Sequence, residues 1–442
     1  MKVTVKISNK NKYFYEGQIF EIDPVDLDGY DIKIDSTIQY QIHKGFGGAF
    51  TNSSAYLYSL MNKENKDKFI NLYFSKSGLD YNFGRLTIGS CDFSIDDYDY
   101  INKGDLDSFS LDYEKKYLFP LLNDVKKEKS IIFIASSWTP PKEFKTNKEK
   151  CKGGKLKKDC YQKYANYLVK YVKGMKDNGF NINYLTLQNE PRAKQTRESC
   201  LFNGREEAEL AKDVHNELET FSLKDCNLLI HDHNLDIAFS RTKEILKNVD
   251  PSFISGVAVH WYNKFDVSNL QNIHERYPNL NIFHTEGCVE FSRLDDHQNK
   301  MGRFESMTMY LKNYILYSLN YVNAFIDWNL LLDQNGGPNH VNNFCEAPLI
   351  YDLNNKELII NPSYYAIKHF SYFIKENARR IDVISKDKDI FVTAYKNVDK
   401  SIIIIILNMS ESRNLRLLID KISYECYSAN DSLVTIQIKG DL

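Results

Sequence analysis

The sequence of 442 residues has almost no net charge, since 57 basic residues stand against 59 acidic ones. A protein without a strong overall field has no general attraction to nucleic acid or to an anionic membrane, so we expect neither partner. A long apolar run is also missing. The longest one, Ile402 to Leu407, has about a third of the residues that a membrane span needs and predicts a buried strand. We therefore expect no integral membrane association.

Cysteines are few, and none of the eight forms a CxxC pair. That is too sparse for a disulfide scaffold and wrongly spaced for zinc, so we expect free thiols in a reducing compartment. Cys151 and Cys160, which flank a lysine-rich loop, are the pair nearest to an exception. The start, Met1 to Lys6, lacks the apolar core of a secretory signal. This favours a cytoplasmic location, with a secreted protein whose leader has been removed as the alternative.

What the sequence does contain is a globular composition, with 43% hydrophobic and 13% aromatic residues. Such a chain can build a sizeable core. From Gly45 onward, short apolar runs alternate with longer amphipathic segments, the first at Tyr56–Tyr73 and the last at Ser363–Lys375. This alternation predicts βα units. The eight expected strands are Gly45–Phe50, Asn82–Gly89, Ile131–Trp138, Asn183–Glu190, Asn227–His233, Gly256–Tyr262, Asn281–Glu286 and Ala324–Leu330.

Eight strands alternating with eight helices predict an α/β fold, a (β/α)8 TIM barrel, over residues 45–378. The two ends of the chain have a different residue pattern from the barrel region. Residues 1–44 alternate polar and apolar side chains, and residues 379–442 hold four further strand patterns, which predict short antiparallel strands. The expected strands there are Ile390–Tyr395, Ser401–Asn408, Leu415–Ile419 and Leu433–Ile438. We expect residues 1–44 and 379–442 to pair into one small all-β sandwich domain beside the barrel.

Polar residues cluster at the C-terminal ends of the expected barrel strands, which is where barrel enzymes carry their chemistry. The carboxylates Glu190 and Glu286 directly terminate two of these strands, and all three tryptophans stand at strand ends as well. Charged groups at buried strand ends are costly unless they are paired or used. Two carboxylates facing each other across a sugar are the minimum machinery for glycosidic cleavage. Retaining enzymes need them about 5–5.5 Å apart and inverting ones about 6.5–9.5 Å apart.

A series of short motifs then resembles glycoside hydrolase family 30, in its glucosylceramidase (acid β-glucosidase) group, between about residues 45 and 380. The order and spacing of the motifs carry the resemblance, more than any one of them. They are the runs 45–51 (GFGGAFT), 90–94 (SCDFS), 137–141 (SWTPP), 189–191 (NEP), 260–262 (HWY), 286–288 (EGC), 327–330 (DWNL) and 336–339 (GGPN).

The resemblance implies retaining hydrolysis of a terminal β-glucosyl unit, without cofactor or metal, from a β-glycoside or glycolipid such as glucosylceramide. By position, Glu190 corresponds to the acid/base and Glu286 to the nucleophile. On chemical grounds Glu190 should then have a raised pKa, and Glu286 should stay ionised. The residues implied to bind substrate are Asp92, Trp138, Asn189, His260, Tyr262, Trp328 and Asn339, and those implied to support them are Arg85 and Asp232.

The sequence also departs from the family pattern. His340 stands where the pattern leads us to expect a tryptophan, which affects the leaving-group side. A loop with eight lysines between Lys142 and Lys158 is either a solvated face or a steering surface for an anionic substrate or lipid. His231, Asp232 and His233 could be interpreted as a metal site, but no third ligand stands at the spacing of a metal-binding motif.

Three alternatives stay open: a β-xylosidase or β-fucosidase, a β-1,6-glucanase, and a carbohydrate-binding barrel without catalysis. The sequence defines no oligomeric state.

Overall fold

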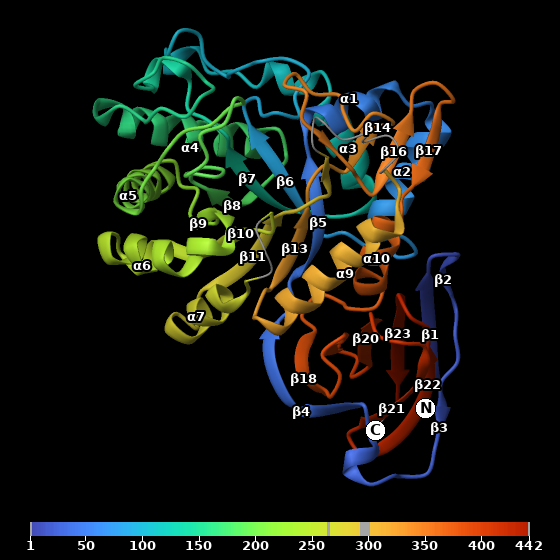
Figure 1. The fold of residues 1–442 in the computed structure, drawn as a ribbon. Coiled ribbons are helices and arrows are strands. Elements are labelled where there is room, and N and C mark those ends of the chain that lie inside the picture. Colours follow the sequence, from blue (N-terminus) through green and yellow to red (C-terminus); the bar gives the residue numbers. More distant parts are fainter. Residues whose placement is uncertain (1, 263–265, 292–300, 441–442) are drawn as a thin grey trace.

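The computed structural model of the protein describes residues 2–262, 266–291 and 301–440. Its larger part is a closed barrel of eight strands, every neighbouring pair of which is parallel (Figure 1). The predicted barrel and its eight strands are therefore confirmed. The barrel strands are β5 (Gly45–Phe50), β6 (Phe83–Ile88), β7 (Ile132–Ser137), β8 (Ile182–Thr186), β9 (Asn227–Asn234), β10 (Ile254–His260), β11 (Asn281–Glu286) and β13 (Ala324–Asp327).

Helices surround the barrel and cover its outer face (Figure 1). Apolar side chains fill the barrel interior, among them Phe83, Leu229 and Phe283. A second, larger apolar layer lies between strands and helices. The helices are α1 (Asn52–Leu60), α2 (Lys63–Phe74), α3 (Leu118–Glu128), α4 (Tyr161–Asp177), α5 (Gly204–Thr220), α6 (Ala238–Asn248), α7 (Ser268–Arg276), α9 (Phe304–Leu319) and α10 (Pro362–Ser371). Within the described ranges, we find no helix that is both long and apolar enough to span a bilayer.

The helix expected at Tyr56–Tyr73 is two helices, so this prediction was wrong in detail. Met61 has an extended backbone and ends α1. The Asn62 side chain then accepts a hydrogen bond from the Asn65 backbone N–H and caps α2. A capping asparagine starts a new helix where the apolar spacing alone suggested one continuous element.

The smaller domain is a ten-stranded sheet built from both ends of the chain, and the predicted sandwich is confirmed. The N-terminal β1 pairs with the C-terminal β23, and β4 pairs with β18. The isoleucine run in β20 is buried along its whole length, as predicted. Two strands, β18 and β22, were not predicted. The strands are β1 (Lys2–Asn9), β2 (Lys12–Glu16), β3 (Phe20–Glu21), β4 (Ile32–Ile42), β18 (Arg379–Ser385), β19 (Ile390–Lys396), β20 (Ile402–Asn408), β21 (Arg413–Ile419), β22 (Ile422–Ser428) and β23 (Ser432–Lys439).

Helices α9 and α10 link the two domains: α9 contacts β19 and β20, and α10 contacts β2 (Figure 1). Two small sheets outside the barrel were also not predicted. They support the loop at residues 334–343, which belongs to the barrel mouth. Their strands are β14 (Leu331–Asp333), β16 (Leu349–Asp352) and β17 (Glu357–Ile360) in one sheet, and β12 (Glu290–Phe291) and β15 (Phe344–Cys345) in the other. All eight cysteines are free, Cys151 and Cys160 included.

Candidate active site

The C-terminal mouth of the barrel collects the side chains that the sequence singles out. Tyr262 and Asn339 are half-buried there, and the others are buried. Burial of so many polar groups requires that they bond to one another. The buried members are Arg85, Asp92, Trp138, Asn189, Glu190, Asp232, His260, Glu286 and Trp328.

Arg85 on β6 is the centre of this network and is fully buried. Its Nη1 donates to Glu286 Oε2 at 3.0 Å and to the Thr285 carbonyl at 2.9 Å. Its Nη2 donates to Asn189 Oδ1 at 2.8 Å and to Asp232 Oδ2 at 2.9 Å. One planar guanidinium thus holds side chains from the ends of β8, β9 and β11 in a common orientation.

Two β-bulges bring polar residues of β9 and β11 into the mouth. In β9, His231 and His233 pair with successive residues of β10, which leaves Asp232 as the extra residue. In β11, Thr285 is extra in the same way. Its hydroxyl donates to Asp232 Oδ1 at 2.8 Å. A bulge re-aims side chains that a regular strand would send to opposite faces.

Glu190 follows β8 in a left-handed backbone conformation, with a φ of 47°. Its amide donates to the carbonyl of Asp232 at 3.0 Å, and the φ of Asp232 is 41°. Non-glycine residues in this region are uncommon and concentrate at functional sites. The two loops are therefore held together through strained residues that both belong to the site.

His260 at the end of β10 joins the two halves of the site. Its Nδ1 lies 3.4 Å from Glu190 Oε1, and its Nε2 lies 3.1 Å from Asp232 Oδ1. On the other side, the Tyr262 hydroxyl donates to Glu286 Oε1 at 3.0 Å. Glu190 and Glu286 therefore belong to one hydrogen-bonded cluster, through His260, Asp232 and Arg85.

The protonation order in the structure is the reverse of the one expected from the sequence. Burial favours a neutral Glu190, but His260, together with His233 and Arg197, lowers the pKa of Glu190 to about 2. Burial raises the pKa of Glu286 to about 7, despite the opposing charges of His260 and Arg85. Burial also opposes a charge on His260, but Glu286, Asp232 and Glu190 raise the pKa of His260 to about 9. Near neutral pH, His260 holds the proton that the sequence argument assigned to Glu190.

The two tryptophans at the ends of β7 and β13 form an aromatic wall beside Arg85. Trp138 and Trp328 are stacked, with ring centroids 5.2 Å apart and an interplanar angle of 21°. The Arg85 guanidinium lies over both rings, at 5.0 Å and 5.9 Å from their centroids. Such a wall suits a flat sugar ring and shields the guanidinium from water.

The two carboxylate oxygens of Asp92 differ in their interactions. Its Oδ2 accepts from Asn343 Nδ2 at 2.8 Å and from Arg197 Nε at 3.2 Å. Its Oδ1 is buried and has no partner in the described part of the chain. A buried carboxylate oxygen without a donor is poised to accept a ligand hydroxyl.

Asn339 forms no hydrogen bond with the other predicted residues within the described ranges, because its side chain bonds within its own loop. Its Nδ2 donates to the Asn343 carbonyl at 2.5 Å, and its Oδ1 accepts from two backbone N–H groups. Asn343, four residues later, contacts Asp92 instead. His340 bonds to the Ser94 carbonyl at 2.9 Å and to Glu198 at 3.1 Å, so it ties two mouth loops together.

The lysine-rich loop is only partly a solvated face. Lys145 is fully buried and donates to Thr139 Oγ1 and to two backbone carbonyls. Lys150 is also buried and bonds to Ser90 and to Asp97. These two lysines anchor the loop to the barrel mouth, while the other six are at least partly exposed.

Four residues of the site were missed by sequence reasoning. Arg197 and Asn343 lie in loops, where their residue types resemble those of any solvated loop. Thr285 was hidden inside a strand pattern. In the sequence His233 stands beside Asp232 and His231, but the Nε2 of His231 bonds to the Asn234 carbonyl at 2.9 Å. His233 instead joins Glu190 and His260 in a group whose ligand atoms all lie within 4.8 Å of one another.

Comparison with known proteins agrees with this architecture. The family described as glycosyl hydrolase family 30 TIM-barrel domain matches residues 43–374, and the family 30 beta sandwich domain matches residues 377–436. The lysosomal acid glucosylceramidase of Mus musculus is 32% identical over 394 residues, which are 84% of this chain and 76% of the mouse protein. The endo-1,6-beta-D-glucanase of Neurospora crassa is 24% identical over 356 residues, 76% of this chain and 71% of that protein.

Among solved structures, SrfJ from Salmonella typhimurium superimposes with a TM-score of 0.94 at 28% identity, covering 100% of both chains. The endo-beta1,6-glucanase BT3312 gives 0.88 at 24% identity over 99% of both chains, a likeness of fold. The match to the barrel family extends over most of the sequence. The chain therefore belongs to glycosyl hydrolase family 30 and is a retaining glycoside hydrolase.

Proposed function

We propose that the protein releases glucose from the end of a β-glucoside, with Glu286 as the nucleophile and Glu190 as the acid/base. The observation that carries this assignment is the single hydrogen-bonded cluster in which Arg85 holds Glu286 and His260 contacts Glu190. Glucosylceramide-like glycolipids are among the proposed substrates, because a relative at 32% identity is a glucosylceramidase.

In the first step Glu286 attacks the anomeric carbon and forms a glycosyl ester, while the bond to the leaving oxygen breaks. That oxygen needs a proton. The proton of His260 Nδ1 crosses the 3.4 Å to Glu190 and passes from there to the leaving oxygen. His260 is thus a positioning residue that stores the proton beside the acid. Arg85 and Tyr262 orient the attacking carboxylate through their bonds to its two oxygens.

In the second step Glu190 takes a proton from water, and the resulting hydroxide displaces Glu286 from the anomeric carbon. The proton then passes from Glu190 back to His260 Nδ1, which restores the starting state. Two inversions at this carbon give a product with the β configuration of the substrate. The glucose itself fits the remaining groups. Asp92 Oδ1 accepts a sugar hydroxyl, and the wall formed by Trp138 and Trp328 packs against the ring.

A substrate panel tests this proposal. We expect hydrolysis of 4-nitrophenyl β-glucoside and of glucosylceramide in detergent micelles, with β-glucose as the first product seen by NMR. The β-xyloside lacks a hydroxymethyl group, so we expect its kcat/KM to be at least about tenfold lower. The matched control is the α-glucoside, which should not react. Because one relative is an endo-1,6-β-glucanase, a β-1,6-glucan belongs in the panel. Oligosaccharide products from it would favour that activity, and no turnover of any β-glycoside would overturn the proposal.

The pH dependence of the first step follows from the burial of Glu286. Burial raises the pKa of its carboxyl to about 7, and the protonated form cannot attack. For 2,4-dinitrophenyl β-glucoside, whose leaving group needs no proton, we expect kcat/KM to fall about tenfold per pH unit below pH 7. The matched variant Tyr262→Phe removes a donor to this carboxylate, so the fall of kcat/KM on the acid side should begin at a higher pH than in wild type. If kcat/KM of the wild type began to fall only between pH 4 and 5, the range of ordinary carboxyl groups, the expected shift would be contradicted.

A further inference from the structure

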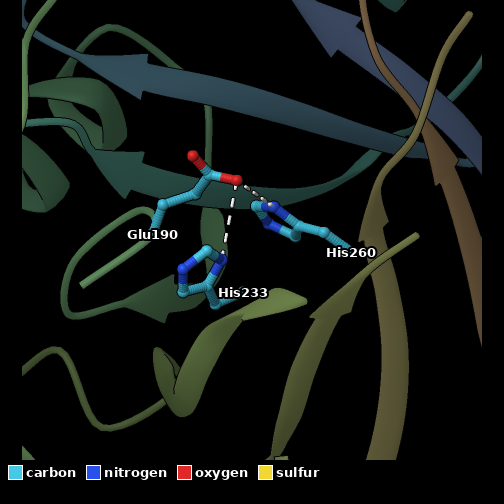
Figure 2. A group of neighbouring side chains, drawn as sticks. All are labelled: Glu190, His233 and His260. Atoms are coloured by element: carbon cyan, nitrogen blue, oxygen red, sulfur yellow. Dashed lines mark hydrogen bonds and ion pairs between the residues drawn. The ribbon is translucent and has the colours of Figure 1, made fainter. Parts of the chain in front are cut away.

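Three side chains from different strand ends point at one another in the mouth: Glu190 after β8, His233 on β9 and His260 on β10 (Figure 2). His260 Nδ1 and His233 Nδ1 lie 3.4 Å and 3.6 Å from the same carboxylate oxygen, Oε1 of Glu190. The contact of His260 is a long hydrogen bond, and the contact of His233 is beyond hydrogen-bond length. The Nδ1 of His233 is moreover buried, and it makes no hydrogen bond within the described ranges. The proposed hydrolysis gives this nitrogen no role.

The two spacings measured from Glu190 Oε1 suit a small cation, and the ligand atoms of all three side chains lie within 4.8 Å of one another. Ligand atoms around a tetrahedral zinc ion, with bonds of about 2.0–2.1 Å, lie about 3.3–3.4 Å apart. The two distances from Glu190 Oε1 are close to that value. Two imidazole nitrogens and one carboxylate oxygen form a donor set typical of zinc, and three protein ligands leave a fourth position for water.

The surroundings of His260 complete the resemblance to a zinc site. While its Nδ1 faces Glu190, its Nε2 lies 3.1 Å from Asp232 Oδ1. Metal-binding histidines commonly make such a bond, because it fixes the ring and leaves the other nitrogen for the ion. Asp232 is itself held by Arg85 and Thr285, so the orientation of the ring is set in advance.

The charge balance also favours a dication. Among the site residues described above, carboxyl groups outnumber guanidinium groups by four to two, and an ion bound at His260 Nδ1 would replace the proton that this imidazole carries near neutral pH. Arg197 lies 3.9 Å from the other oxygen of Glu190 and is closer to Asp92, at 3.2 Å. The carboxylates are Asp92, Glu190, Asp232 and Glu286, and the guanidinium groups are Arg85 and Arg197.

We propose that Glu190, His233 and His260 bind a zinc-class divalent metal ion, and that the bound ion inhibits hydrolysis. Bound to Glu190 Oε1 and His260 Nδ1, the ion occupies both atoms through which the acid proton moves. The metal site is inferred from the positions of its three side chains and does not depend on the proposed function. The inhibition rests on the proposed role of Glu190 as acid/base.

Binding is tested without reference to activity. Protein freed of metal with a chelator is titrated with ZnCl2 by calorimetry, and with CoCl2 while the visible absorption of tetrahedral cobalt is recorded. We expect binding of one ion per chain, and at least about tenfold weaker binding in His233→Gln. The matched control is His215→Gln, because His215 stacks on Phe253 on the outside of the barrel, and it should bind as wild type does. The unfolding temperature of each metal-free variant shows that it is folded.

Inhibition is then measured with 4-nitrophenyl β-glucoside, each variant being compared with its own metal-free rate. We expect zinc to inhibit the wild type and the His215→Gln variant, and to inhibit His233→Gln only at concentrations at least about tenfold higher. Absence of zinc binding, or equal binding by His233→Gln and wild type, would overturn the site. Zinc binding that depends on His233 but leaves hydrolysis unchanged would overturn the inhibition alone. If no glycoside is hydrolysed at all, the titrations still decide whether the site exists.

Discussion

Replacement of Glu286 by glutamine is expected to lower kcat/KM for 4-nitrophenyl β-glucoside by about 10,000-fold, or about 5 kcal/mol of transition-state stabilisation. An amide keeps the size of the carboxylate, and its one oxygen can still accept from Arg85, which bonds to Glu286 Oε2 at 3.0 Å. The amide NH2 then takes the place of Oε1 and faces the Tyr262 hydroxyl, which can turn to accept from it. The substitution therefore removes the nucleophile while disturbing its surroundings little. The measurement is steady-state kinetics, with the unfolding temperature as a check on folding.

The control for this experiment is the same chemical change at an exposed site. Glu275 is exposed on α7 and accepts a hydrogen bond from Gln271, one turn earlier, so Glu275→Gln should stay within about twofold of wild type. A second readout identifies the nucleophile directly. A 2-deoxy-2-fluoro-β-glucoside with a good leaving group should label wild type on the peptide that contains Glu286, and should not label Glu286→Gln. Activity of the variant within tenfold of wild type, or a label on another residue, would exclude Glu286 as the nucleophile.

Replacement of Glu190 by glutamine is expected to cause a loss that depends on the leaving group. For a poor leaving group such as a methyl or glycolipid aglycone, kcat/KM should fall by about 1,000-fold, because its oxygen cannot depart without a proton. For the 2,4-dinitrophenyl glucoside the same parameter should fall by less than about tenfold, because that phenolate needs no proton. The measurement is kcat/KM over a series of aryl glucosides, which should become strongly dependent on leaving-group acidity in the variant.

Azide offers an independent check on the same residue. In the smaller variant Glu190→Ala, azide can enter the space of the carboxylate and attack the glycosyl ester without a general base. We expect azide to restore turnover and to give β-glucosyl azide, while it leaves wild type and Glu275→Gln unaffected. An equal loss for all leaving groups in Glu190→Gln, or an α-glucosyl azide product, would contradict the proposed double displacement.

The experiments on Glu190 also concern His260, because either side chain could be the source of the acid proton. In the structure the pKa of His260 is raised to about 9, chiefly by Glu286 and Asp232 acting against burial. Glu190, by contrast, is held ionised. Its role as acid therefore depends on a neighbour that can supply a proton. The sequence predicts this proton on Glu190, because the imidazole 3.4 Å from the carboxylate comes close to it only in the folded chain.

Much of the fold could be predicted because the signals are local. Apolar runs of strand length, amphipathic segments and the polar residues that end each strand are patterns within about ten residues. The expected strands Gly45–Phe50 and Asn281–Glu286 agree with β5 and β11 to the residue. The error at Tyr56–Tyr73 arose because a capping side chain at Asn62 weighs more than the apolar spacing across it. The unpredicted β22 has a partly exposed, mixed pattern.

In the candidate site, too, the residues with a local signal could be predicted and the others could not. Glu190, Glu286 and the tryptophans were found because they end strands. Arg197 and Asn343 were not, because their importance comes from Asp92, and Asn343 is 251 positions away from it in the chain. Asn339 matched a motif, yet its amide is used by its own loop, and only the hydrogen bonds reveal this.

The sequence by itself determined the barrel, the sandwich made from both chain ends, and the two carboxylates at the ends of β8 and β11. Those features depend on residue periodicity and on the order of the strands, which the chain carries locally. The tertiary structure alone decided which polar atoms meet, where the proton resides and which histidine faces Glu190. The physical reason is that charges and hydrogen bonds act over a few ångströms through space, as between Arg85 and Glu286, which lie 201 residues apart in the chain.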